Sequence, residues 1–181
     1  MVRVADREMQ AMRQNVRLIL ASAALALVAG AARANPPPPV YVHMNGANMF
    51  LERTVFIRPG QKLVFVNQDT GPHGLQGYNP ATGKLDPRFH DTVLPGTKGA
   101  GHTVHSFTVT FRHQGVFDYF CPVHAMLMKA PGPVWAPMKR PTVHGFGTPM
   151  SGEVIVTTDR ALLADNPKTA HERIVPGYFG G

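Results

Sequence analysis

The sequence predicts an all-β protein that folds as a single-domain Greek-key β-sandwich or barrel. Two observations support this prediction. Short runs rich in β-branched and aromatic residues recur along the chain, and turns that contain glycine or proline separate them. After residue 34, no segment shows the apolar spacing of an amphipathic helix of any length. Short strands joined by turns bury their apolar faces by packing one sheet against another.

The strands follow one another at short intervals along the chain. The clearest is at residues 62–67, where apolar side chains alternate on both faces, as in a strand inside a sandwich. The others are predicted at residues 40–44, 53–57, 102–111, 115–121 and 153–158. We expect antiparallel pairing, which is the usual arrangement of sandwiches built from short strands.

Two long segments do not fit the strand pattern. Residues 74–101 are rich in glycine and residues 125–149 in proline, so both are predicted to be irregular. Connections of this length are uncommon in a small domain and are often functional. Residues 159–181 are predicted to form a C-terminal tail that begins with one short helical turn.

The N-terminal 34 residues are organised like a secretory signal peptide. Arginines precede an apolar run at residues 18–28, and Ala32 and Ala34 provide the small side chains that a signal peptidase reads. We expect cleavage after Ala34, export to the periplasm and no stable membrane insertion afterwards. Residues 35–39 then form a proline-rich linker and residues 40–158 the folded domain. The alternative is an uncleaved anchor, although the apolar run is short for a bilayer core about 30 Å thick.

Charge and cysteine content narrow the range of functions. The formal net charge is +7, but no basic run is dense enough to predict binding to nucleic acid. A mildly positive chain suits a partner with an acidic face. Cys121 is the only cysteine, so an exported form has no internal disulfide. A bound metal would protect this thiolate from oxidation.

Cys121 is one of four potential metal ligands at the ends of predicted strands. His124 follows three residues later, His73 comes shortly after the strand at residues 62–67, and Met150 opens the last strand. One thiolate, two imidazoles and one thioether suit copper, because sulfur ligands favour Cu(I) and imidazole binds both oxidation states. Rigid strand ends would also keep the ligands still while copper changes its charge.

Three segments that carry these residues resemble the cupredoxins, the small blue-copper proteins such as plastocyanin, pseudoazurin and amicyanin. They read PGQKLVFVN followed by His73, GVFDYFCPVH ending at His124, and MSGEVIV beginning at Met150. The resemblance implies a cupredoxin-like fold with one type 1 copper per chain. It also implies that His73, Cys121 and His124 surround the metal in a plane, with Met150 as the weak axial ligand.

The sequence departs from the cupredoxin pattern at two places. In the relatives named above, the axial methionine follows the second histidine within a few residues, whereas residues 125–149 separate His124 from Met150 here. Either this segment is an insertion in the ligand loop, as we favour, or Met126 or Met128 is the axial ligand. Gly74 also stands where many cupredoxins have Asn or Ser, so the hydrogen bonding around the cysteine is expected to differ.

The resemblance implies an electron carrier and not an enzyme. It would take single electrons from a donor such as a c-type cytochrome and pass them to an oxidase or reductase in the periplasm. One alternative is a copper protein for tolerance, storage or delivery, for which His43, Met44 and Met49 could form a second copper site. Others are a unit of a multidomain copper enzyme and a metal-free interaction domain.

The segment at residues 125–149 is expected to lie beside His124. It combines apolar residues, among them Trp135, with the cations Lys129, Lys139 and Arg140. An apolar patch edged by positive charge is suited to docking an acidic redox partner. The alternative is that Trp135 folds inward and the segment only caps the barrel.

Overall fold

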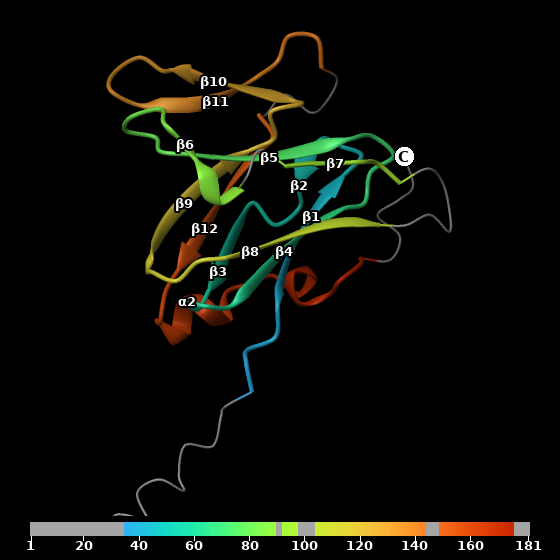
Figure 1. The fold of residues 1–181 in the computed structure, drawn as a ribbon, viewed down its shortest axis with the longest axis vertical. Helices are drawn as coiled ribbons and strands as arrows, with labels where there is room; N and C mark the ends of the chain where they lie inside the picture. Colours follow the sequence, from blue (N-terminus) through green and yellow to red (C-terminus); the bar gives the residue numbers. More distant parts are fainter. Residues whose placement is uncertain (1–34, 90–91, 98–103, 144–148, 176–181) are drawn as a thin grey trace, which may run out of the picture. The chain divides into compact units, whose positions relative to one another are not determined.

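Two β-sheets form a sandwich in the computed structural model, which describes residues 35–89, 92–97, 104–143 and 149–175. The first sheet has the order β2 (Met49–Phe50), β1 (Val40–Asn45), β4 (Lys62–Asn67) and β8 (His105–Thr110). The second has the order β3 (Thr54–Ile57), β12 (Ser151–Val156), β9 (Gly115–Phe120), β5 (His73–Tyr78) and β6 (Leu85–Asp86), and β7 (Thr92–Leu94) also pairs with β5. Strands β10 (Ala125–Lys129) and β11 (Trp135–Lys139) form a separate hairpin (Figure 1). The all-β sandwich prediction is confirmed.

Parallel pairing occurs at two places, and here the prediction of an antiparallel sandwich is wrong. Strand β1 pairs in parallel with β4, and β12 pairs in parallel with β3. In both cases the chain visits the other sheet after the first strand of the pair. It then returns to the original sheet, where the second strand runs in the same direction as the first. Alternating apolar residues predict which face of a strand is buried, but not which neighbour it pairs with.

Aromatic rings join the two sheets in the core. Phe65 of β4 and Tyr119 of β9 are fully buried, with ring centroids 5.1 Å apart in an edge-to-face arrangement. Phe50 and Phe89 contact the same tyrosine at 4.9 and 5.6 Å. Burying each such ring contributes roughly 1.5–3 kcal/mol, so this cluster fixes how the sheets that carry the candidate ligands sit on each other.

Residues 74–101 are more regular than predicted. Among the described residues, this segment includes most of β5, then β6, the 3₁₀ turn Pro87–Phe89 and β7. The two glycines of β5 made this segment look like a turn in the sequence. In the structure, each glycine lies where another side chain packs closely against the backbone. A side chain at Gly77 would collide with the Phe89 ring, and one at Gly74 would lie 2.8 Å from the ring carbons of Pro122.

The segment at residues 125–149 is likewise not irregular throughout. Strands β10 and β11 pair antiparallel. Ala125 lies opposite Lys139 at one end of the ladder, and Lys129 lies opposite Trp135 at the other. The Trp135 amide donates to the carbonyl oxygen of Pro80 at 2.7 Å, and its ring covers Gly83, where an added Cβ would lie 2.5 Å from the indole. Trp135 therefore packs on the β5–β6 turn, in agreement with the alternative expectation that this side chain folds inward. The opposite face of the hairpin remains accessible.

The C-terminal segment packs against the sandwich. Helix α2 (Arg160–Ala164) is the predicted short helical turn, and the Asp159 side chain caps it by accepting from the amide of Ala161 at 2.8 Å. The 3₁₀ turn Lys168–His171 contacts β1 and buries Ala170. The predicted signal peptide at residues 1–34 lies outside the described residues. Over the described ranges, we find no helix with the length and apolar character needed to cross a membrane.

Candidate metal centre

Two neighbouring strands and one tight turn bring His73, Cys121 and His124 together. Strand β5 begins with His73, and the adjacent strand β9 ends one residue before Cys121. The carbonyl of Cys121 then accepts from the amides of His124 and Ala125 at 3.1 and 2.8 Å, and this turn folds His124 back over the cysteine. Sequence spacing predicted the Cys121–His124 pair, and the pairing of β5 with β9 adds His73.

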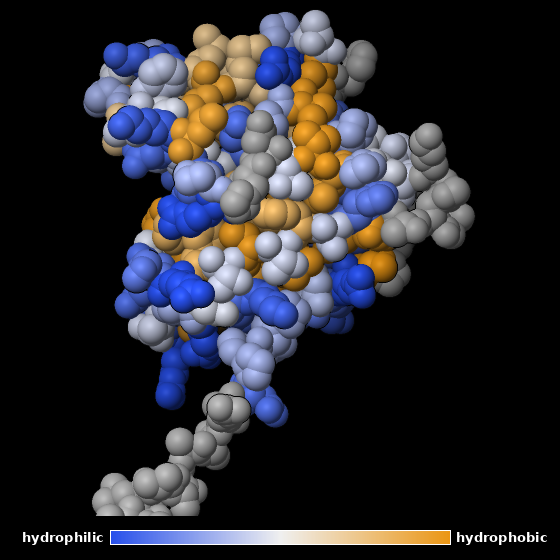
Figure 2. Space-filling view, viewed as in Figure 1, coloured by the Kyte–Doolittle hydropathy of each residue, from blue (hydrophilic) through white to orange (hydrophobic). Residues whose placement is uncertain are grey.

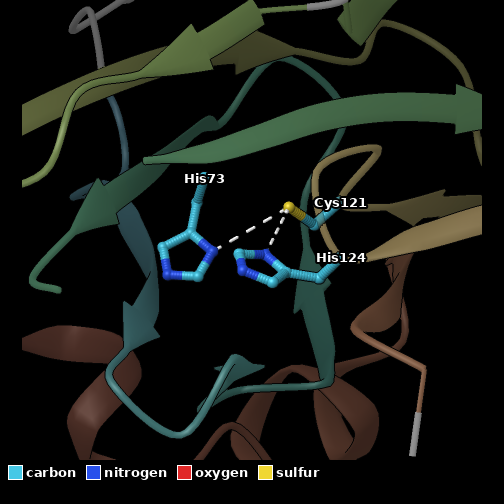
Figure 3. A group of neighbouring side chains, drawn as sticks. All are labelled: His73, Cys121 and His124. Carbon is cyan, nitrogen blue, oxygen red and sulfur yellow. Dashed lines mark hydrogen bonds between the residues drawn. The ribbon is translucent and has the colours of Figure 1, made fainter. Parts of the chain in front are cut away.

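The three side chains converge on one point, as Figure 3 shows. The Cys121 Sγ lies 3.3 Å from the Nδ1 of His124 and 3.8 Å from the Nδ1 of His73. All three ligand atoms lie within 4.8 Å of one another. His73 and Cys121 are fully buried and His124 is partly buried. Within the described part of the chain, this is the one group of three His, Cys, Asp or Glu residues close enough to hold a metal ion.

The Asp69 carboxylate fixes the orientation of His73. Its Oδ2 lies 2.8 Å from the Nε2 of His73, so the Nε2–H donates to the carboxylate and Nδ1 faces the cysteine. Burial pushes the pKa of Asp69 up, but the hydrogen bond and charge of His73 and nearby backbone amides outweigh it and hold that pKa below its usual value. A carboxylate behind a ligand histidine is a common support in metal sites, and the sequence around Asp69 carries no signal for this role.

Asn67 organises the loop that carries Asp69. Its side-chain amide donates to the carbonyls of Gly71, Leu94 and Pro95 at 3.0, 3.1 and 3.0 Å, and its Oδ1 accepts from the amide of Asp69 at 3.0 Å. Asn67 is completely buried at the end of β4. These four hydrogen bonds tie the Asp69 loop and the end of β7 to one buried side chain, which keeps Asp69, and therefore the ring of His73, in place.

Backbone amides surround the sulfur of Cys121. The amide of Gly74 donates to Sγ at 3.2 Å. Burial raises the pKa of the Cys121 thiol, and the amides of Gly74, His124 and Val123 oppose that rise because they stabilise the thiolate. A bound cation would favour the thiolate further. Gly74 thus supports the sulfur through its backbone amide.

Both histidines are neutral near pH 7, as metal ligands must be. Burial lowers the pKa of His124 to about 4, helped by the proximity of His73 and opposed by the charge of Asp69. Burial also lowers the pKa of His73, although Asp69 works against this. Two neutral imidazoles beside a thiol that can ionise form a donor set that suits copper in either oxidation state.

No protein-family model and no curated protein matches the chain. Among solved structures, a novel purple cupredoxin from Nitrosopumilus maritimus is 20% identical, with 65% of this chain and 99% of that chain covered and a TM-score of 0.42. Amicyanin from Paracoccus versutus is 21% identical, with 70% and 88% covered and a TM-score of 0.39.

The fold is a two-sheet β-sandwich. Its candidate ligands fit one copper ion of type 1, because the donor set is soft, preassembled and largely shielded from water. The structure confirms the predicted β-sandwich and brings three of the four predicted ligands together.

Met150 and Met128 lie in very different surroundings. Met150 immediately precedes β12, is 2% exposed, and accepts the Cys121 amide at 2.9 Å through its carbonyl. Met128 lies on β10 and is 48% exposed, and Met126 of the same strand is partly exposed. Met150 is therefore the one of these three methionines that is both buried and hydrogen-bonded through its backbone to the cysteine.

His43 makes hydrogen bonds within the protein and is not available for the second copper site considered from the sequence. Its Nδ1 lies 3.0 Å from Oε1 of Glu52, and both side chains are completely buried. Its Nε2 lies 3.3 Å from the carbonyl of Arg173. Since both ring nitrogens face protein partners, His43 joins β1 to the C-terminal segment and does not form a metal site with Met44 and Met49. Glu52 lies in the bend between β2 and β3, and nothing in its sequence surroundings indicates that it pairs with His43 of β1.

Proposed function

We propose that this protein is a type 1 copper electron carrier. His73 and His124 would hold the metal through Nδ1, Cys121 through its thiolate, and Met150 would be the weak fourth ligand. The observation that supports this best is the convergence of the three ligand atoms within 4.8 Å of one another. Copper would supply the one-electron redox change, and the protein would supply ligands that do not need to rearrange.

The surroundings of the ligands favour fast electron exchange without substrate chemistry. Asp69 and Gly74 hold His73 and Cys121 from outside the ligand set. His124 is the most exposed of the three, so electrons would enter and leave at its edge. The Asp69 carboxylate beside the cluster already accepts from His73, so its role would be to position that ligand.

Redox proteins are the partners that this function requires. A c-type cytochrome as donor and a terminal oxidase or reductase as acceptor would suit a periplasmic carrier, and export follows from the signal-peptide pattern at residues 1–34. The net positive charge favours partners with acidic docking faces. A protein for copper tolerance, storage or delivery remains the alternative, and the number of coppers bound per chain distinguishes the two.

The visible spectrum of the oxidised, copper-loaded protein tests the proposal. We expect one copper per chain and an intense thiolate-to-Cu(II) charge-transfer band. Cys121→Ala should abolish the band and leave the β-sandwich folded, because the chain has no other cysteine. His43→Gln is a matched control in a buried histidine outside the site, and it should keep the band. A colourless wild-type protein, or a coloured Cys121→Ala variant, contradicts the ligand assignment.

A further inference from the structure

The β10–β11 hairpin carries methionines on one face. Met126 and Met138 are directly opposed partners in the antiparallel ladder, and Met128 is opposed to Ala136. Directly opposed residues share a face, and so do residues two apart on one strand. All three methionines therefore belong to the same face of the hairpin, with the small side chain of Ala136 leaving space beside them.

Burial shows that this face is the outer one. Pro137, which belongs to the other face, is buried, and Trp135 of that face covers Gly83 of the β5–β6 turn. Met128 and Met138 are 48% and 52% exposed, among the most exposed large apolar side chains of the described chain. Figure 2 shows apolar colour gathered over the hairpin at the top of the view, between hydrophilic residues.

The spacing allows three sulfur atoms to meet at one ion. Cβ atoms of directly opposed residues lie about 5 Å apart and those of diagonal neighbours about 7 Å apart. Met126–Met138 is the direct pair and Met128–Met138 the diagonal one. The methionine side chain is long, unbranched and flexible, so its thioether can turn toward a shared centre.

The electrostatics of the hairpin suit a monovalent cation. Lys129 and Lys139 belong to the other face, and the Arg140 guanidinium donates to the carbonyl of Pro122 at 3.0 Å. The thioethers carry no charge, so their binding would not offset the free energy needed to desolvate a divalent ion. Soft sulfur ligands select Cu(I) in preference to hard cations.

We propose that Met126, Met128 and Met138 form a second, surface site that binds Cu(I) on the outer face of the β10–β11 hairpin. This site is separate from the His73–Cys121–His124 cluster and goes beyond electron transfer at that cluster. It begins two residues after His124 in the sequence, so copper held there would lie next to the exposed edge of the type 1 centre.

The test is a Cu(I) titration of the copper-loaded protein under anaerobic, reducing conditions, with bicinchoninate as competing chelator. We expect a second Cu(I) per chain whose affinity is the same at pH 5.5 and pH 7.5, since a thioether has no proton to lose. Sites that include His or Cys lose affinity at low pH. With ¹³C-methyl-labelled methionine, the signals of Met126, Met128 and Met138 should shift during binding, while that of Met49 should stay in place.

Leucine variants show whether the second Cu(I) depends on the methionine sulfur atoms or only on the apolar surface of the hairpin. The triple variant M126L/M128L/M138L keeps an apolar hairpin face but removes the sulfur atoms, and it should lose the second Cu(I). Met49→Leu is the matched control and should retain it. Loss of Cu(I) in the triple variant alone supports the site. No second Cu(I) in the wild type, or a second Cu(I) that persists in the triple variant, overturns it.

The outcome is independent of the type 1 assignment. The triple variant should keep the thiolate charge-transfer band, and Cys121→Ala should keep the Cu(I) bound at the hairpin. A wild-type protein that binds hairpin Cu(I) but shows no charge-transfer band would refute the electron-carrier proposal and leave the second site intact. The reverse pattern would refute the second site alone.

Discussion

Met150 and Met128 allow the axial ligand to be tested at the level of single residues. Met150→Leu should keep copper and colour but raise the reduction potential, because Cu(II) loses a weak donor that Cu(I) needs less. We expect a rise of about 59 mV, which corresponds to a tenfold change in a one-electron equilibrium. Cyclic voltammetry of both variants measures it, and the exposed Met128→Leu should leave the potential unchanged. A shift in Met128→Leu without one in Met150→Leu would place the axial ligand on β10.

The lowered pKa of His124 predicts how the copper-free protein responds to acid. An unfolded histidine binds a proton near pH 6.5, whereas the pKa of the folded one is about 4. Between these values the unfolded state holds more protons, so the free energy of unfolding should fall as the pH drops from about 6.5 to about 4. His73 contributes in the same direction, because its pKa is also lowered.

Urea unfolding of the copper-free protein at several pH values measures this effect. His124→Gln removes the titrating group while keeping a polar side chain of similar size, so its stability should depend less on pH than that of the wild type. The raised pKa of Asp118 acts in the opposite direction, through burial and the nearby charge of Glu153, and is the same in both proteins. Equal pH dependence of the two proteins would show that His124 is not buried as a neutral side chain.

The candidate ligands could be predicted from sequence, because their chemistry and their positions at strand ends are both local features. Their supporting partners could not. Asp69 supports His73 only because Asn67 folds the intervening loop back on itself. Glu52, in the bend between β2 and β3, pairs with His43 of β1. A carboxylate has no sequence signal for such a role, since solvated carboxylates look the same.

At the level of secondary-structure elements, the contact between β5 and the Cys121–His124 turn can be tested at Gly74. A methyl group there would lie 2.8 Å from Pro122, while the Gly74 amide must stay in place to donate to Sγ. Gly74→Ala should therefore push the turn away and destabilise the copper-free protein by roughly 1–3 kcal/mol, the usual cost of overpacking.

Gly71→Ala is the matched control for this change. Gly71 lies in the loop just before β5, and an added Cβ there would meet its nearest atom at an ordinary 3.5 Å. Urea unfolding gives the stabilities, and the energy of the charge-transfer band reports the thiolate–copper bond. If Gly74→Ala behaves like Gly71→Ala in both measurements, the tight packing of Pro122 on β5 does not position the cysteine.

The elements that sequence predicted well are those with a strong period of two. Strand β4 spans the predicted residues 62–67, because its alternation leaves no other reading. Strand β5 was missed because its two glycines resemble a turn, although contacts with Pro122 and Phe89 require them. The β10–β11 hairpin was missed because its prolines resemble breakers, whereas Pro137 is tolerated in a two-stranded sheet that has only edges.

For the whole molecule, the hairpin decides what a redox partner meets beside His124. Strand β10 begins at the residue after His124, and the Arg140 amide after β11 donates back to the carbonyl of His124 at 3.0 Å. The exposed side chains of Met128, Val134 and Met138 lie on the hairpin together with the exposed Lys129. This combination of apolar surface and positive charge suits an acidic partner that must approach the exposed edge of a copper ligand.

The hairpin can be removed without breaking the site. Ala125 and Lys139 are directly opposed in the ladder, so replacing residues 126–138 by Asn-Gly would close the strands with a type I′ turn. The copper spectrum should not change, because the three ligands and Asp69 lie outside the deletion. Electron transfer to the physiological partner should become slower and less sensitive to salt. Stopped-flow kinetics over a range of ionic strength measure both effects.

Two further variants show which property of the hairpin matters. Lys129→Gln removes one exposed charge and should weaken the salt dependence while leaving the rate at high salt unchanged, because salt screens charges beyond about 8 Å at physiological ionic strength. The triple leucine variant keeps the apolar surface and should transfer electrons like the wild type. If the shortened protein keeps an intact copper spectrum and unchanged partner kinetics, the hairpin only covers the β5–β6 turn through Trp135, and partners must reach His124 from another side.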